Sequence, residues 1–98
     1  MGIDGKWTGV VEGIDGRELE LIYEFKTDGP ILKGSIKSRL GGGEILSGRI
    51  DGNSISFTLN AGNYIIVNKG IITNDSIEIT EEFEGKVINL TLKRIKTK

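Results

Sequence analysis

The chain has 98 residues, with 13 Lys and Arg against 14 Asp and Glu and a net charge of -1. This length predicts one domain, and the balanced charge excludes the strongly basic surface typical of nucleic-acid-binding domains. Cys and His are both absent, which excludes disulfides, a thiolate nucleophile and a Cys- or His-based metal centre, and removes the commonest general base. Sixteen Ile and four Val against eight Leu and one Ala favour strands over helices.

The first predicted strand, residues 5–13, has Trp7, Gly9 and Val11 in one phase. The second, residues 17–27, has the clearest pattern, since apolar residues alternate with glutamates and predict one buried and one solvated face. Its inward positions are Leu19, Leu21, Tyr23 and Phe25.

The same two-residue period recurs along the rest of the chain. Further strands are predicted at 31–38, 44–51, 54–60, 63–73, 76–82 and 86–95. Short turn signals such as Asp51-Gly52 and Asn74-Asp75 separate them, and the three glycines at 41–43 predict a looser connection. No segment is long enough for a crossover helix, so neighbouring strands are expected to be antiparallel. The predicted fold is all-β, a single domain over 1–98 forming an antiparallel up-and-down β-barrel of about eight strands.

Four glycines occur inside these predicted strands, at Gly9, Gly34, Gly48 and Gly70. Glycine weakens a strand, and its presence there usually marks a bend or a close backbone approach. Such positions are expected in a small barrel, whose strands must turn corners.

The two ends of the chain are predicted to meet. Trp7 opens the first strand in inward phase, and Arg94 closes the last strand in phase with Leu90 and Leu92. In a closed barrel of eight antiparallel strands these two positions are neighbours at the same end. We therefore expect the guanidinium to stack on the indole as a structural plug, in preference to a ligand contact.

A family resemblance follows from these motifs and their order. A Gly-x-Trp opening and a closing Arg are similar to the calycin pattern of lipocalins. The runs GKWTGVVE, ELIYEFK, GRIDGNSISF and TLKR more closely resemble a small bacterial lipocalin-like barrel. The resemblance implies a binding domain without known activity and an extracytoplasmic location, periplasmic or secreted, although the sequence shows no signal peptide. Typical lipocalins have longer strands and a C-terminal helix, so a deep ligand cavity is not expected here.

Strand direction predicts which inward residues line the barrel mouth opposite Trp7. Loops on a rigid scaffold often bind ligands, so Leu40 and the glycines after it are predicted to form the most mobile part of the rim. Eight strands leave room for at most one small ligand, which favours a shallow apolar site. The predicted ligand-binding residues are Val11, Leu19, Ile36, Leu46, Leu59, Tyr64, Phe83 and Ile88.

Other side chains allow two interpretations. The aromatic residues are either a stacking platform for sugars or bases, or core; Tyr23, Phe25 and Phe57 favour core, whereas Tyr64 and Phe83 leave both open. Facing carboxylates would suit a glycosidase and acidic turn residues would suit calcium, but a solvated face is favoured for the glutamates. These are Glu18, Glu20, Glu24, Glu81, Glu82 and Glu84. The basic tail 93–98 is either a contact for nucleic acid or anionic lipid, or an ordinary solvated terminus, and the second interpretation is favoured.

The predicted function is a non-catalytic binding module for a small apolar or amphiphilic ligand, without metal or cofactor. The alternative is an accessory domain of an extracytoplasmic carbohydrate-processing system, with a glycan as ligand. Neither nucleic-acid binding nor membrane insertion is expected. No constellation of Ser, Lys and carboxylates that would support catalysis is evident in the sequence, so no catalytic residue is predicted.

Overall fold

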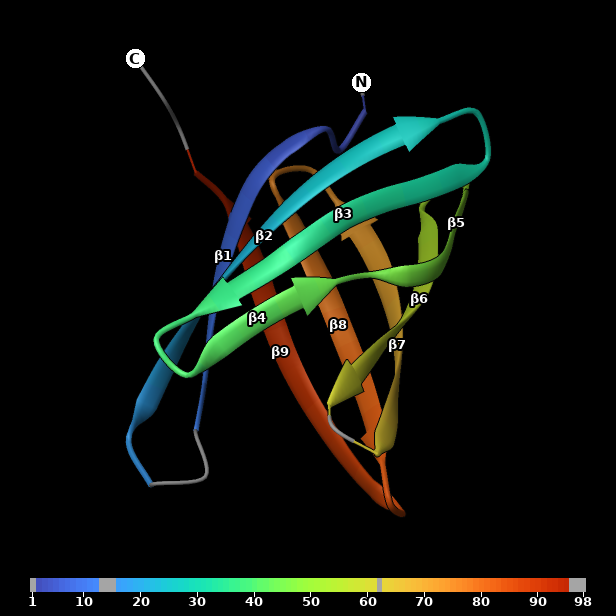
Figure 1. Cartoon of the computed structure of the whole chain (residues 1–98). Coiled ribbons are helices and arrows are strands. Elements are labelled where there is room, and N and C mark those ends of the chain that lie inside the picture. The colour runs from blue at the N-terminus through green and yellow to red at the C-terminus, as the bar shows by residue number, and fades with distance from the viewer. Residues whose placement is uncertain (1, 13–15, 62, 96–98) are drawn as a thin grey trace.

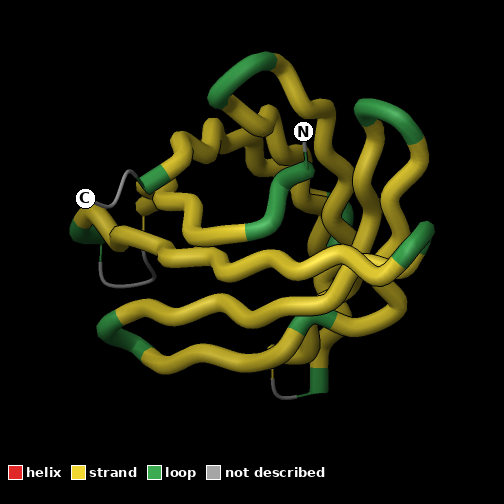
Figure 2. Tube along the Cα trace, turned by 90° about the horizontal axis from the view of Figure 1, so that it is seen from above, coloured by secondary structure: helices red, strands yellow, loops and turns green. Residues whose placement is uncertain are grey.

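A computed structural model describes residues 2–12, 16–61 and 63–95. Every regular element among these residues is a strand, and short turns join them (Figures 1 and 2). The strands are β1 (Gly5–Glu12), β2 (Glu18–Asp28), β3 (Ile31–Ser38), β4 (Gly41–Glu44), β5 (Leu46–Asp51), β6 (Ser54–Ala61), β7 (Tyr64–Thr73), β8 (Ser76–Phe83) and β9 (Lys86–Arg94). No helix in the described part of the chain is long and apolar enough to cross a membrane.

The strands close into an antiparallel barrel. Consecutive strands pair round the ring, except that β5 takes the place beside β3 while β4 pairs with the other part of β3. The ring closes where β1 meets β9, with Trp7 opposite Arg94 and Thr8 opposite Lys93. The predicted fold class is therefore confirmed: an up-and-down barrel of eight strands, with one additional strand.

The additional strand corrects one prediction. Residues 41–43 were predicted to form a loose connection, but they belong to β4 and pair with β3, Gly42 opposite Lys37. A Cβ at Gly42 would overlap the carbonyl oxygen of Ile36, so glycine permits a close backbone approach there. The turn that precedes β4 is also held, since Ser38 Oγ donates to the Gly41 carbonyl at 2.8 Å. The strand pairing requires glycine at position 42, and the sequence alone did not show it.

The barrel core is filled mainly by the inward residues that the alternation predicts. Three aromatic rings pack together inside it, with centroids 5.6 Å apart for Tyr23 and Phe25 and 6.0 Å apart for Phe25 and Phe57. Close packing explains two of the strand glycines: a Cβ at Gly34 would overlap the Glu24 carbonyl oxygen, and one at Gly48 that of Leu32. This part of the interior is packed with side chains.

Candidate functional site

The end of the barrel near the N-terminus is closed by Trp7 and Arg94. The Trp7 side chain is fully buried, and its Nε1 donates to the carbonyl oxygen of Ile3 at 2.9 Å. The Arg94 guanidinium carbon lies 4.4 Å from the centroid of the indole ring. Its two terminal nitrogens donate to the carbonyl oxygens of Asp4 and Gly2, at 3.0 and 3.1 Å. The predicted contact of Trp7 with Arg94 is present, and these hydrogen bonds hold the segment before β1 against it.

A second contact holds this segment, and sequence patterning did not reveal it. One carboxylate oxygen of Asp4 accepts hydrogen bonds from the backbone N–H of Thr27 at 3.0 Å and from its hydroxyl at 2.8 Å. Ile3, between Gly2 and Asp4, is 2% exposed and belongs to the core. Trp7, Arg94 and Asp4 thus each have hydrogen-bond partners within the chain, as is expected of a structural element.

At the opposite end, which we call the mouth, an open groove lies between β4 and β6. It arises because β4 pairs with β3, whereas the pairing of β6 with β5 extends only to Thr58 opposite Leu46. The groove has a volume of about 580 Å³. Its lining consists of Ile36, Leu40, Gly41, Gly42, Gly43, Glu44, Leu46, Leu59, Asn60 and Ile66. The surface is therefore largely apolar and glycine-rich, with one carboxylate at its border.

The structure brings together some of the predicted mouth residues. Ile36, Leu46 and Leu59 line the groove, whereas Leu40 and Ile66, which also line it, were not among the predicted binding residues. Leu40 was assigned only to the rim. Ile66 lies in an uninterrupted apolar run, Ile65 to Val67, where alternation gives no clear phase.

The other five predicted residues lie outside the groove lining. Val11 and Leu19 face one another across β1 and β2. The rings of Tyr64 and Phe83 meet edge to face, 5.1 Å between centroids and 86° between planes. Ile88 pairs with Glu81 and is 44% exposed. These five residues are spread over β1, β2, β7, β8 and β9, away from the gap between β4 and β6.

A polar cluster inside the barrel was missed by the sequence interpretation. Glu81 was assigned to a solvated face, but it follows Ile77 and Ile79 in the inward phase of β8 and is half-buried. Burial raises the pKa of its carboxyl above the ordinary value. Glu81 pairs across the strands with Asn68, which is fully buried. Glu18, Glu20, Glu24, Glu82 and Glu84 are exposed, so the assignment to a solvated face holds for them.

Tyr23 completes the cluster from the other side of the barrel. Its side chain is fully buried, and burial, followed by the charge of Glu81, raises the pKa of its hydroxyl. The Tyr23 hydroxyl and the Asn68 side-chain oxygen have no hydrogen-bond partner. The Asn68 nitrogen donates to the carbonyl oxygen of Ile66 at 3.3 Å, which connects the cluster to the groove lining.

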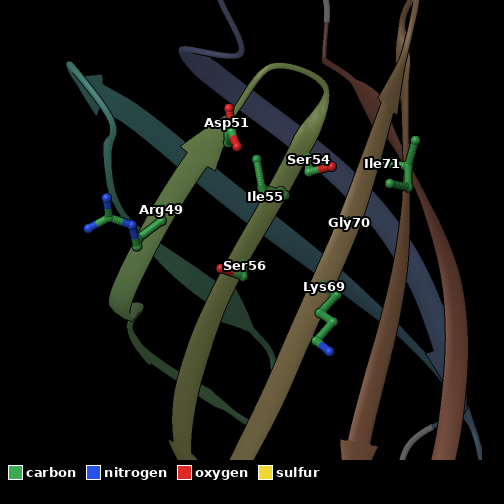
Figure 3. A pocket seen from close by; sticks show the side chains of 8 residues that line it. All are labelled: Arg49, Asp51, Ser54, Ile55, Ser56, Lys69, Gly70 and Ile71. Atoms are coloured by element: carbon green, nitrogen blue, oxygen red, sulfur yellow. The ribbon is translucent and has the colours of Figure 1, made fainter.

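The outer face of the barrel has a depression that, unlike the groove, is lined mainly by polar and charged side chains. It lies over β5, β6 and β7 and has a volume of about 350 Å³ (Figure 3). Ser56 stands between Arg49 and Lys69, its partners on the neighbouring strands. Both basic side chains are exposed.

In the described residues no group of three or more Asp, Glu, His or Cys is arranged to hold a metal ion.

Comparison with known proteins gives a structural similarity. No family model matches the sequence, and no curated protein is significantly similar to it. A solved structure described as "REP1-NXSQ fatty acid transporter" is similar over 98% of both chains, with a TM-score of 0.68 and 13% sequence identity. At this identity the similarity establishes the barrel fold.

Proposed function

We propose that this protein is a non-catalytic binding module, lipocalin-like in design, whose groove between β4 and β6 holds the apolar part of a small amphiphile. The observation that most supports this proposal is the groove itself, which has a volume of about 580 Å³ and is bordered by Ile36, Leu46 and Leu59. Small-molecule sites are typically concave, mostly apolar and of about 300–1,000 Å³. The fold similarity to a structure described as a fatty acid transporter supports a ligand of this class.

The surface round the mouth also favours an apolar ligand. Most of the exposed large apolar side chains lie in or near the turns and strand ends on this side of the barrel. They are Leu40, Leu46, Tyr64, Ile65, Val67, Val87 and Ile88. They add apolar surface at the end of the barrel where the groove opens.

The packing of the barrel limits how deep the ligand reaches. Trp7 and Phe25 are at most 2% exposed and fill the part of the barrel nearest the closed end. A chain entering between β4 and β6 therefore lies across the mouth and extends only a short way inward. The extracytoplasmic location implied by the sequence resemblance stays a prediction.

The direct test is titration of N-phenyl-1-naphthylamine, a neutral apolar dye, into the wild type and the Leu46→Glu variant. Leu46 is 40% exposed and lines the groove, so a carboxylate there should disfavour an apolar ligand without disturbing the core. We expect binding to the wild type with a fluorescence increase, and about tenfold weaker binding to the variant.

Ile31→Glu is the matched control. Ile31 is 38% exposed and lies at the start of β3, near the closed end, so the same charge is added outside the groove. This variant should bind the dye as the wild type does. Equal binding to wild type and Leu46→Glu would place the site elsewhere. Stabilisation by soluble oligosaccharides together with no dye binding would favour an accessory carbohydrate-binding domain.

A further inference from the structure

The polar cluster inside the barrel contains two unpartnered groups in a closely packed interior. Tyr23 and Asn68 are both fully buried, and the Tyr23 hydroxyl and the Asn68 side-chain oxygen lack hydrogen-bond partners. Buried polar atoms in folded proteins nearly always have partners, because an unpaired one costs the free energy of its lost hydration. Such groups, held by the fold of a binding barrel, are candidates for contact with a ligand.

The cluster lies one layer below the mouth. Asn68 follows Ile66 by two residues on the inward face of β7, and Ile66 lines the groove. Glu81 precedes Phe83 by two residues on the inward face of β8, and Phe83 is half-buried against the exposed ring of Tyr64. Asn68 and Glu81 thus lie about one residue pair along the strands from residues at the mouth.

The chemistry of the cluster favours a donor from the ligand. The free atom of Asn68 is a carbonyl oxygen, which only accepts hydrogen bonds, and the carboxyl of Glu81 accepts when ionised. The Tyr23 hydroxyl can donate or accept. Acceptors thus outnumber donors. A ligand carboxylate would add further acceptors and a second negative charge beside Glu81, whereas a hydroxyl or ammonium group would supply the missing donors.

We propose that Tyr23, Asn68 and Glu81 form a head-group site that selects amphiphiles with a hydrogen-bond-donating head, an alcohol or a primary amine, over fatty acids. This inference rests on the proposed function, because the groove holds the chain of the same ligand. It distinguishes this barrel from one selecting a carboxylate, for which a basic side chain would be the expected partner.

The test compares three probes of equal chain length, decan-1-ol, decylamine and decanoate, by calorimetric titration near pH 7. We expect the alcohol and the amine to bind the wild type about tenfold or more tightly than decanoate, the factor of roughly one buried hydrogen bond. Asn68→Leu should reduce the preference for the alcohol, and Glu81→Gln should weaken the amine while leaving the alcohol nearly unchanged.

Asn89→Leu is the matched control, because Asn89 is exposed on β9 and its side-chain oxygen accepts from the Thr80 hydroxyl outside the barrel. It should leave all three affinities unchanged. If Asn68→Leu proves unstable, the conservative Glu81→Gln still tests the site. Equal affinities for the three probes, or tighter binding of decanoate, would overturn the head-group site and leave the proposed function standing. No binding of any probe would overturn both.

Discussion

The two ends of this barrel are built from opposite kinds of contact. At the closed end, Trp7 and Arg94 are fixed by hydrogen bonds to the carbonyl oxygens of Gly2, Ile3 and Asp4. At the mouth, β4 separates from β6, and apolar side chains such as Leu46 and Tyr64 remain 40% and 51% exposed. At the closed end the polar groups of Trp7, Asp4 and Arg94 bond within the chain, whereas the mouth leaves apolar surface in water.

This contrast indicates that the closed end mainly contributes stability and the mouth mainly contributes ligand binding. A 98-residue chain has a modest core, so loss of one large buried side chain is a large fraction of its stability. Substitutions at the closed end should therefore lower the free energy of unfolding strongly. Substitutions of exposed side chains at the mouth should change ligand binding while costing little stability.

The largest contrast is expected between Trp7→Ala and Tyr64→Ala. Trp7 is fully buried, and its truncation should lower the free energy of unfolding by about 3–5 kcal/mol. Tyr64 is 51% exposed and packs on Phe83, so its truncation should cost about 1 kcal/mol or less. Urea unfolding of the two variants measures both values. Similar losses in the two would show that the plug is not the structural element described here.

Arg94→Met separates the hydrogen bonds of the plug from its packing, since Met keeps much of the aliphatic stem. The variant loses two hydrogen bonds from a charged group and the contact over the indole. We expect a loss of about 2 kcal/mol in the free energy of unfolding. Increased exposure of Trp7, seen as a red shift of its fluorescence, should accompany it. An unchanged melting temperature would contradict the assignment.

Gly42→Ala and Gly43→Ala test the close approach of β4 to β3 at the mouth. A Cβ at Gly42 would overlap the backbone of Ile36, whereas a Cβ at Gly43 has nothing within 4 Å. We expect Gly42→Ala to cost about 1–2 kcal/mol and to weaken dye binding, because β4 must move away from β3. Gly43→Ala should be neutral or slightly stabilising. Equal effects of the two would contradict the β3–β4 pairing.

The smallest effect is a pH dependence from Glu81. The folded state raises the pKa of this carboxyl above its ordinary value of 4.5, so it binds more protons than the unfolded chain just above that pH. Its contribution to stability is greatest below pH 4.5 and is lost as the pH rises through the folded-state pKa. The melting temperature of Glu81→Gln minus that of the wild type should therefore increase as the pH rises from 4 to 8. A constant difference over this range would show that Glu81 is not buried.

Much of the barrel follows from the sequence, because a period of two determines both the strands and their inward faces. It predicted the contact of Trp7 with Arg94, 87 residues apart, from phase and strand direction alone. The two-residue period could not predict β4, because its glycines have no side chains that would show a phase. At Glu81 the period was overruled, because the charge was taken as a sign of an outward position although the residue is in inward phase. Asn68 was overlooked because a lone amide in an apolar run gives no signal until its neighbours are known.

The proposed function requires an apolar ligand to bind at the mouth and not at the closed end. The most direct measurement is the set of ¹H–¹⁵N NMR shifts on titration with decan-1-ol. We predict shifts at the backbone amides of Ile36, Leu59 and Ile66, with the indole N–H of Trp7 unchanged because it remains bonded to Ile3. Shifts concentrated at the Trp7 indole and Thr27, with the groove amides unmoved, would contradict the account.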